Sequence, residues 1–201
     1  MHHVLQTAKP TKDHRLVLCR ALAAVGLVVL GMIAAPVQAG ERVPYQARGG
    51  IDIAEAAAKA WARDALLVYI ENDEGVNTTG AAVRWGYLYF SSGLEQTRVY
   101  SVRDGKILVA ENLDMLFDAP PVAPEWIDSG HALSVAEAVA GRAYCTLNKG
   151  QLSTMLLMRG AFHSGDPNQT TWTLIYTSPS APSLFVVVDA LEGTVSRTWR
   201  G

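Results

Sequence analysis

The sequence predicts an α+β fold that consists of two αβββ units, with antiparallel sheets and helices packed on one face. Two alanine-rich segments of similar sequence lie 82 residues apart, and each is followed by a run of strand-like segments. Strands that follow one another without intervening helices pair in the antiparallel sense. A proline-rich stretch without periodicity separates the two runs. The pattern leaves open whether the two sheets stay separate or join.

The first 39 residues have the pattern of a cleavable secretory signal. An uncharged apolar run, residues 21–35, precedes Val37-Gln38-Ala39, which is a cleavage site of the small-x-small type. A retained membrane anchor is the alternative, but Arg20 leaves the run shorter than the roughly 20 residues of a spanning helix. We therefore expect an exported protein, periplasmic or secreted, that begins at Gly40. The basic residues before the run are Lys9, Lys12, Arg15 and Arg20.

The chain after the leader is mildly acidic. Four of the 17 Lys and Arg residues and one of the 19 Asp and Glu residues lie in the leader, which leaves a net formal charge of −5. No cluster of Lys and Arg is present, which argues against nucleic acid or anionic lipid as a partner. Cys145 is the single cysteine outside the leader, so the mature chain has no intramolecular disulfide and its stability depends on the core.

The two alanine-rich segments share a predicted helix start. Residues 51–58 (IDIAEAAA) and 133–140 (LSVAEAVA) are identical at four of eight positions. In each segment a capping residue is followed three positions later by Glu, which is the pattern of a capping box at a helix N-terminus. The predicted caps are Asp52 and Ser134, completed by Glu55 and Glu137.

Both segments also place apolar residues at helical spacing, which predicts a buried stripe on each helix. The first stripe consists of Ala54, Ala57, Ala58, Trp61, Ala65 and Val68. The second consists of Ala136, Val139, Ala140, Ala143 and Leu147. We therefore expect the two units to superpose with Asp52 on Ser134 and Trp61 on Ala143.

Strands are predicted after each helix. The first unit has them at 81–90, 97–102 and 107–110, and Asp104-Gly105 between the last two is typical of a hairpin turn. The second unit has them at 153–162, 171–176 and 184–188, with a last piece at 194–199.

The chain thus divides into a signal peptide (1–39), a first unit (40–117), a linker (118–130) and a second unit (131–201). The linker contains three prolines, so it is expected to be a loop. Its Trp126 is expected to dock against the sheet or between the units, because burial of an indole contributes several kcal/mol at about 25 cal/mol per Å².

The end of the chain resembles the PepSY-like group of exported domains. Residues 186–195 read VVVDALEGTV, close to the V-x-V-D-A-x-T-G-x-V ending of that group, with Glu192 in place of the usual Thr. Residues 100–107 form a shorter version that lacks the Asp-Ala pair. The resemblance implies a non-enzymatic module of the cell envelope, in some relatives thought to restrain a protease. It carries over no catalytic residue, cofactor or metal.

A set of alternating aromatic residues is the candidate interaction face. Alternation places the side chains of each set on one face of a strand. Two readings are open: these faces pack on the helices as core, or they form an exposed aromatic platform for a peptide or sugar. Leu88 and Phe90 make the opposite face of the first strand apolar as well. The candidate residues are Trp85, Tyr87 and Tyr89 in the first unit and Trp172 and Tyr176 in the second.

Other candidate sites each have a simpler structural reading. Cys145 is predicted as a packed apolar residue, with an exposed thiol that pairs with another chain, or a catalytic thiol beside His131 or His163, as alternatives. His163 lies in a polar segment that reads as a turn rather than a metal site. The acidic residues Glu71, Asp73 and Glu74 are predicted to form a solvated loop.

These observations favour a binding or inhibitory module of the envelope, without a cofactor, whose partner is another envelope protein or a protease. The alternative is an interaction or assembly protein that uses an exposed sheet face or edge. An enzyme is the third and least favoured reading. No known catalytic or nucleotide-binding motif is present, so its type would be unrecognised. Membrane contact is expected only through an uncleaved leader, and the oligomeric state is left open.

Overall fold

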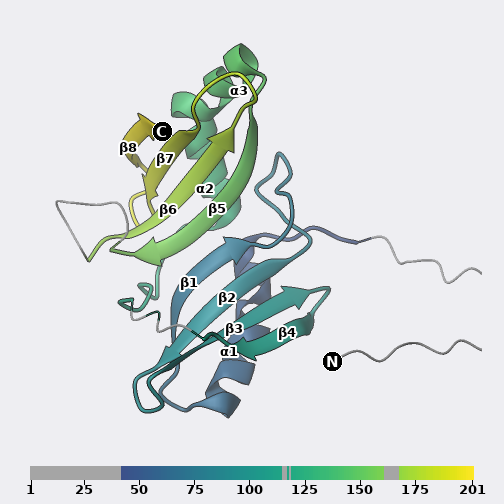
Figure 1. Ribbon diagram of the computed structural model, residues 1–201, viewed down its shortest axis with the longest axis vertical. Coiled ribbons are helices and arrows are strands. Elements are labelled where there is room, and N and C mark those ends of the chain that lie inside the picture. The colour runs from purple at the N-terminus through teal and green to yellow at the C-terminus, as the bar shows by residue number, and fades with distance from the viewer. Residues whose placement is uncertain (1–41, 115–116, 118, 161–167) are drawn as a thin grey trace, which may run out of the picture. The chain divides into compact units, whose positions relative to one another are not determined.

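The computed structural model describes residues 42–114, 117, 119–160 and 168–201. The predicted signal peptide, Cys19 within it, and His163 lie outside these residues. Residues from Gly40 to Gly201 form one compact unit. The protein is an α+β protein with one antiparallel sheet of eight strands, in the order β4-β3-β2-β1-β5-β6-β7-β8 (Figure 1). The two predicted sheets have therefore joined.

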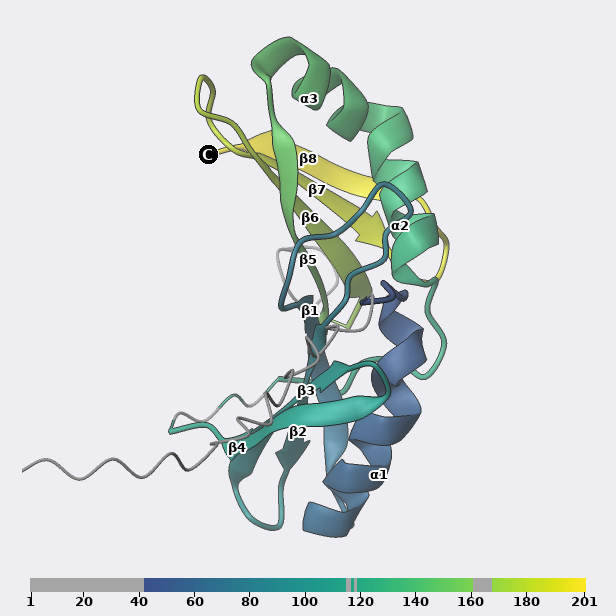
Figure 2. The same ribbon diagram turned by 90° about the vertical axis from the view of Figure 1, so that its right-hand side faces the viewer.

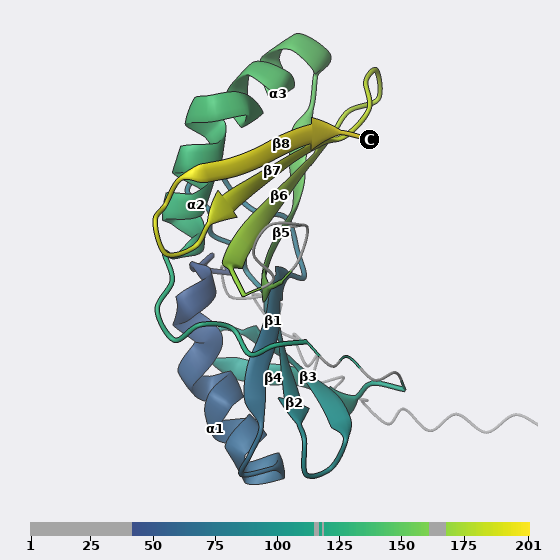
Figure 3. The same ribbon diagram turned by 90° about the vertical axis from the view of Figure 1, so that its left-hand side faces the viewer.

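Each half of the sheet is preceded by helix. The first half consists of η1 (Ala47–Gly50), α1 (Ile51–Trp61), β1 (Leu66–Asn72), β2 (Trp85–Ser91), β3 (Gln96–Arg103) and β4 (Lys106–Asn112). The second consists of α2 (Ser129–Ala136), η2 (Glu137–Gly141), α3 (Arg142–Asn148), β5 (Gln151–Arg159), β6 (Thr170–Thr177), β7 (Leu184–Asp189) and β8 (Val195–Arg200). Figures 2 and 3 show the helices together on one side of the sheet.

The αβββ description was wrong, because each half contributes four strands. In the second half the fourth strand, β8, is the last piece predicted at 194–199, whereas in the first half one strand was not predicted. The missing strand in the first half is β1, which the predicted helical stripe had absorbed through Ala65 and Val68. The helix ends at Trp61, and Ala62 after it is extended. Aromatic and β-branched side chains favour a strand in the segment that follows.

The strand β1 also joins the two halves. It pairs with β2 on one side and with β5 on the other, where Ile70 lies opposite Leu157. Asn72 at its end is buried, and its side chain accepts a hydrogen bond from Met155 N at 2.6 Å and donates one to Ser153 O at 3.3 Å. The amide side chain thereby continues the contact between β1 and β5 beyond their last backbone pair, Glu71 with Leu156.

A π turn changes which residues of the second helix are buried, so the predicted stripe was wrong in part. In η2 the N–H of Arg142 donates to the carbonyl of Glu137, five residues earlier, so the turn holds one residue more than an α turn. The extra residue rotates the helix that follows, so Tyr144 is buried in place of Ala143. Val139 is 59% exposed and Leu147 79% exposed, contrary to prediction. Trp61 consequently cannot match Ala143.

The predicted capping boxes are absent. Helix α1 runs directly on from η1, so its N-cap position is Gly50, without a capping side chain, and Asp52 lies inside the helix. Helix α2 begins at Ser129 within the predicted linker, so Ser134 also lies inside a helix. The observed cap is Asp128, whose carboxylate accepts from Ser129 N at 2.8 Å and from Arg48 N at 3.1 Å.

The linker tryptophan packs into the core as predicted. Residues 119–128 form neither helix nor strand, and Trp126 among them is 7% exposed. Its ring meets that of Trp172 edge to face, with the centroids 5.8 Å apart, and the guanidinium of Arg48 lies 4.0 Å above it. Trp126 thus connects the linker to the start of α1 and to the second half of the sheet.

Candidate functional site

The predicted aromatic residues are core, not an exposed platform. All five are at most 2% exposed: Trp85, Tyr87, Tyr89, Trp172 and Tyr176. They lie on the face of the sheet that the helices cover, which is the physical reason for their burial. Tyr100, on the same face of β3, donates its hydroxyl to Ala57 O of α1 at 3.3 Å. The reading of these five residues as an interaction surface was therefore wrong.

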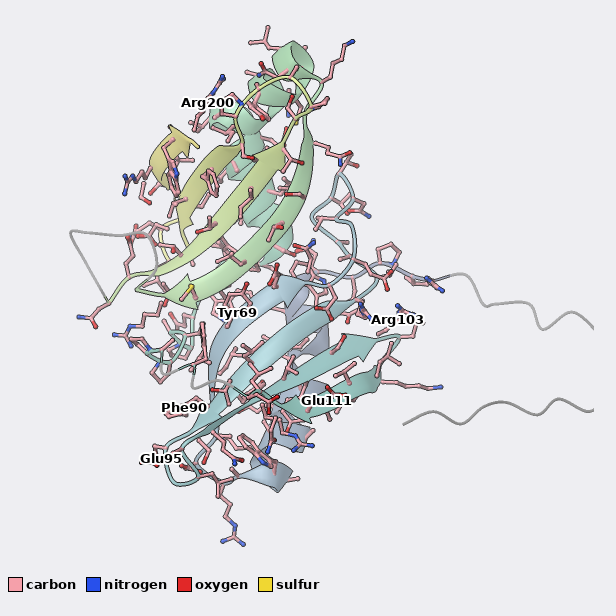
Figure 4. All side chains as sticks on the ribbon, viewed as in Figure 1. Tyr69, Phe90, Glu95, Arg103, Glu111 and Arg200 are labelled. Carbon is pink, nitrogen blue, oxygen red and sulfur yellow. The ribbon has the colours of Figure 1, made fainter. Side chains whose placement is uncertain are left out.

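The opposite face of the sheet carries the apolar side chains that remain partly exposed. In the part of the chain that the structure describes, all helices lie on the other side (Figures 2 and 3). Figure 4 shows Tyr69 and Phe90 on this face, with α1 behind the sheet. Leu66 lies opposite Phe90, and Tyr69 opposite Leu88. We call this surface the open face; its apolar residues are Leu66, Tyr69, Leu88, Phe90, Val99, Met158, Ile175 and Phe185.

The predicted acidic loop takes part in an ion-pair network at the edge of the open face. Arg84 Nε lies 3.4 Å from a carboxylate oxygen of Asp73, which also accepts a hydrogen bond from Ser101. Arg103 pairs with Glu74. The prediction of a simple solvated loop was therefore wrong, because arginines on β3 and on the loop before β2 partner these carboxylates.

A cavity of about 610 Å³ lies beside the π turn, and we call it the η2 cavity. Helix residues form one wall, the start of β5 forms another, and the loop between β1 and β2 forms the third. That loop is held to the start of α2 by Ser129 Oγ, which donates to Gly80 O at 2.6 Å. The lining residues are Gly75, Val76, Asn77, Thr78, Leu133, Glu137, Arg142, Cys145, Gln151 and Leu152.

The π turn decides which helix residues reach this cavity. In an α-helix, residues five positions apart point in clearly different directions, whereas one π turn brings them close to the same face. The i to i+5 hydrogen bond therefore places Glu137 and Arg142 on one wall. The pairing of Glu137 with Arg142 on one wall was not predicted, and Gly141 within the helical segment is the only local signal of an irregular turn in the sequence.

Gly141 lies where the side chain of Tyr176 on β6 comes very close. A Cβ atom at Gly141 would stand 2.4 Å from the hydroxyl of Tyr176 and 2.8 Å from a carboxylate oxygen of Glu137. In the part of the chain that the structure describes, the buried hydroxyl of Tyr176 has no partner at hydrogen-bond geometry, although Glu137 lies near it. Burial first, and then the charge of Glu137, raise the pKa of Tyr176. The phenol therefore stays neutral behind the wall of the cavity.

Cys145 is partly buried in the wall of the η2 cavity, so the structure supports packing more than an open thiol. Burial raises the pKa of this thiol, and the negative charge of Glu137 raises it further. A catalytic cysteine needs the opposite shift, because the thiolate is the nucleophile. Within the described residues, no group of three or more His, Cys, Asp or Glu side chains has the arrangement of a metal site.

Comparisons with known proteins reveal the fold but no family. No protein-family model matches the chain, and no curated protein does. The structure resembles the crystal structure of a putative lipoprotein from Clostridium difficile 630, with a TM-score of 0.51 and 14% sequence identity over 80% of this chain and 94% of the other. At this identity the likeness shows a shared fold alone. Among the described residues, no helix has the length and apolar character needed to cross a membrane.

Proposed function

We propose that this protein is an exported, non-enzymatic binding module of PepSY-like type that recognises a partner protein through the open face. The observation that carries the proposal is the one-sided cover of the sheet: the helices bury one face, and the other presents partly exposed apolar and aromatic residues on several adjacent strands. A contiguous apolar surface rimmed by charged groups is typical of a protein interaction site. Glu111 on β4 and the ion pairs of Asp73 and Glu74 supply such a rim.

We further propose that the sheet arose by duplication of one unit of helix and four strands. Two hydrogen bonds support this: Trp85 Nε1 donates to Tyr45 O, and Trp172 Nε1 donates to Ile127 O, both at 2.8 Å. The two acceptors are 82 residues apart, and each precedes the N-cap of η1 or α2. Matching irregularities also interrupt the pairing of β1 with β2 and of β5 with β6. Duplication would double the width of the open face.

Export rests on the leader. The basic segment, the short apolar run and the small-x-small site predict cleavage after Ala39. The word lipoprotein in the name of the structural neighbour agrees with an exported protein. N-terminal sequencing of the mature product is expected to begin at Gly40, and a membrane-bound form that retains residues 21–35 would contradict cleavage.

The binding proposal is tested with variants of the open face. Leu66→Glu/Phe90→Glu places two carboxylates opposite each other on the open face, and Leu147→Glu on α3 is the matched control, because Leu147 is 79% exposed and lies on a helix. Each purified protein, residues 40–201, serves as bait for the exported fraction of its own organism. We expect the wild type and the control to retain the same partner, and the double variant to lose at least about 90% of it, since a buried unpaired charge costs several kcal/mol.

Two outcomes contradict this proposal. One is recovery of the same partner by the double variant whose fold is intact by circular dichroism. The other is a wild-type chain that retains no protein specifically. The alternative is self-assembly, either through the same face or through the edge strands β4 and β8. It predicts concentration-dependent dimers in sedimentation velocity. The double variant abolishes dimers that form through the open face, and a variant of an edge strand abolishes those that form through that edge.

A further inference from the structure

We propose that the η2 cavity is a binding site for a small zwitterion, an amino acid or a short peptide. This site is distinct from the open face, because its lining comes from the helical layer, from the loop between β1 and β2 and from the first residues of β5. Figure 2 shows this loop reaching from the first half toward α2. The volume of about 610 Å³ lies in the range of small-molecule sites in proteins.

The charge pattern of the helical wall identifies the ligand class. Glu137 and Arg142 lie one π turn apart on this wall, yet within the described residues neither has an ion pair with another side chain. An acid and a base that line one cavity without pairing fit a ligand that carries both an ammonium and a carboxylate. A charge-assisted hydrogen bond to each end orients such a ligand.

The remaining walls suit the body of an amino acid or a short peptide. Gln151 and Asn77 offer amide groups for peptide N–H and C=O groups, whereas Val76, Leu133 and Leu152 offer apolar contact for a side chain. Asn77 is fixed in place, because its carbonyl oxygen accepts from Thr79 N at 2.9 Å and from Ala81 N at 3.0 Å. Among the described residues no hydrogen bond uses its amide nitrogen, which is left for a ligand.

A smaller cavity in the first half shows the same chemistry. It measures about 380 Å³, and its walls include Glu55 and Lys59 of α1 and Leu67 at the start of β1. On the proposed duplication, Glu55 corresponds to Glu137, and Lys59 corresponds to Arg142 with the one extra residue of the π turn. An acid and a base therefore recur on the same wall in both halves.

Basic side chains of the first-half cavity are engaged by the chain itself, which is why we assign the site to the η2 cavity. Lys59 Nζ donates to Ala65 O at 2.6 Å, and Arg48 lies over the ring of Trp126 in the wall. The residue 82 positions after Arg48 is Gly130, so the second half has no side chain that corresponds to Arg48. Its cavity is left larger, with its acid and base available to a ligand.

Cys145 provides a direct measurement of occupancy. It lines the η2 cavity and is the only cysteine in residues 40–201, so iodoacetamide reports on this one site. The rate of alkylation is measured for the mature chain alone and with a panel of free amino acids and dipeptides. N-acetylated and C-amidated forms of the same compounds remove one charge each. We expect saturable protection by at least one zwitterion, and protection weaker by about tenfold or more with its blocked forms, because a hydrogen bond to a charged group contributes that much affinity.

Variants separate the proposed contacts from general effects. Glu137→Gln and Arg142→Gln are each expected to weaken binding of the protecting zwitterion by about tenfold or more. Glu137→Gln is also expected to weaken the C-amidated form, which keeps the ammonium, and to leave the N-acetylated form unchanged, whereas Arg142→Gln is expected to do the reverse. Glu95→Gln, at an exposed position in the turn between β2 and β3, is the control, and ligands are expected to protect its Cys145 as they do in the wild type. The proposal is overturned if no zwitterion slows alkylation of a folded chain, or if both cavity variants bind as the wild type does. Unchanged capture of a protein partner by these variants would show that the open face acts independently.

Discussion

The indole rings of Trp85 and Trp172 meet edge to face, with their centroids 6.2 Å apart and their planes at 72°. Trp85 belongs to β2 and Trp172 to β6, so the contact spans the two central strands that join the halves of the sheet. Both rings are fully buried, and both indole N–H groups are hydrogen-bonded. Because edge-to-face aromatic pairs contribute about 0.5–1.5 kcal/mol beyond their buried area, this contact couples the two halves energetically. We expect the protein to unfold in a single cooperative transition.

Replacement of Trp126 is expected to weaken that coupling. Trp126 packs on Trp172 and beneath Arg48, so Trp126→Ala leaves a cavity between the linker and the sheet. We expect a loss of about 2–4 kcal/mol in the free energy of unfolding, the usual range for removal of a large buried side chain. Urea denaturation followed by far-UV circular dichroism measures it, with Leu147→Ala as an exposed control. An unchanged midpoint, or two transitions in the wild type, would show that the halves unfold independently.

The sequence predicted the class of fold but not the number of strands. The alternation in the segments that became β2 and β6 correctly placed Trp85, Tyr87 and Tyr89 together on one face. Which face the helices cover depends on tertiary packing, so burial of these side chains did not follow from their alternation. The segment of β1 was misassigned because Ala65 and Val68 happen to continue the helical spacing of Trp61. Only pairing with β2 and β5 decides in favour of a strand.

The candidate site was less predictable than the fold. A π turn adds one residue to a helix, and a single sequence gives no reliable signal for it. All later positions rotate, which exposed Leu147 and buried Tyr144. The η2 cavity also takes one wall from the loop between β1 and β2, more than 50 residues away in sequence. Long-range contacts of this kind leave no periodic pattern in the chain.

Substitution of Gly141 tests the close contact behind the η2 cavity. A Cβ atom there would lie 2.4 Å from the hydroxyl oxygen and 2.6 Å from a ring carbon of Tyr176. We expect Gly141→Ala to destabilise the protein by about 1–3 kcal/mol, as overpacking usually does. In a Tyr176→Leu background, which removes both atoms, the same change is expected to cost at least about 1 kcal/mol less. Equal effects in the two backgrounds would contradict the contact.

Removal of the Tyr176 hydroxyl alone is expected to be tolerated. Among the described residues the buried hydroxyl has no hydrogen-bond partner, so Tyr176→Phe removes an unsatisfied polar group and retains the ring. We expect a free energy of unfolding equal to or up to about 1 kcal/mol above that of the wild type. Tyr87→Phe is the matched control, because the Tyr87 hydroxyl donates to Ala47 O at 2.7 Å and its loss is expected to destabilise. Destabilisation by Tyr176→Phe of the same size as by Tyr87→Phe would indicate a hydrogen bond to Glu137 instead.

The thiol of Cys145 is expected to react slowly at neutral pH. Burial raises its pKa, and the carboxylate of Glu137 contributes a further part of the shift. The alkylation rate is therefore expected to rise with pH around a midpoint that lies above the pKa of an ordinary cysteine, which is about 8.5. Glu137→Gln removes a negative charge and is expected to lower the midpoint, whereas Glu111→Gln is not. A midpoint below that of free cysteine would restore the reading of Cys145 as an activated thiol.

Asp64 is expected to contribute acid-sensitive stability to the turn between β2 and β3. Its carboxylate accepts hydrogen bonds from Gly93 N and Ser91 Oγ, both at 2.7 Å, and from Ser92 Oγ at 3.2 Å. The bond from Gly93 N is the main cause that lowers the pKa of Asp64, and the bond from Ser91 adds to it. Because the folded pKa lies below the unfolded value of about 3.9, the stabilisation is fully present above pH 4 to 5 and is lost as the pH falls through the folded pKa. The measurement is the urea midpoint of unfolding between pH 7 and pH 2. At the acid end this midpoint is expected to fall less steeply for Asp64→Asn than for the wild type. The control Glu111→Gln is expected to follow the wild type. Parallel curves for Asp64→Asn and the wild type would mean that these hydrogen bonds do not favour the ionised carboxylate.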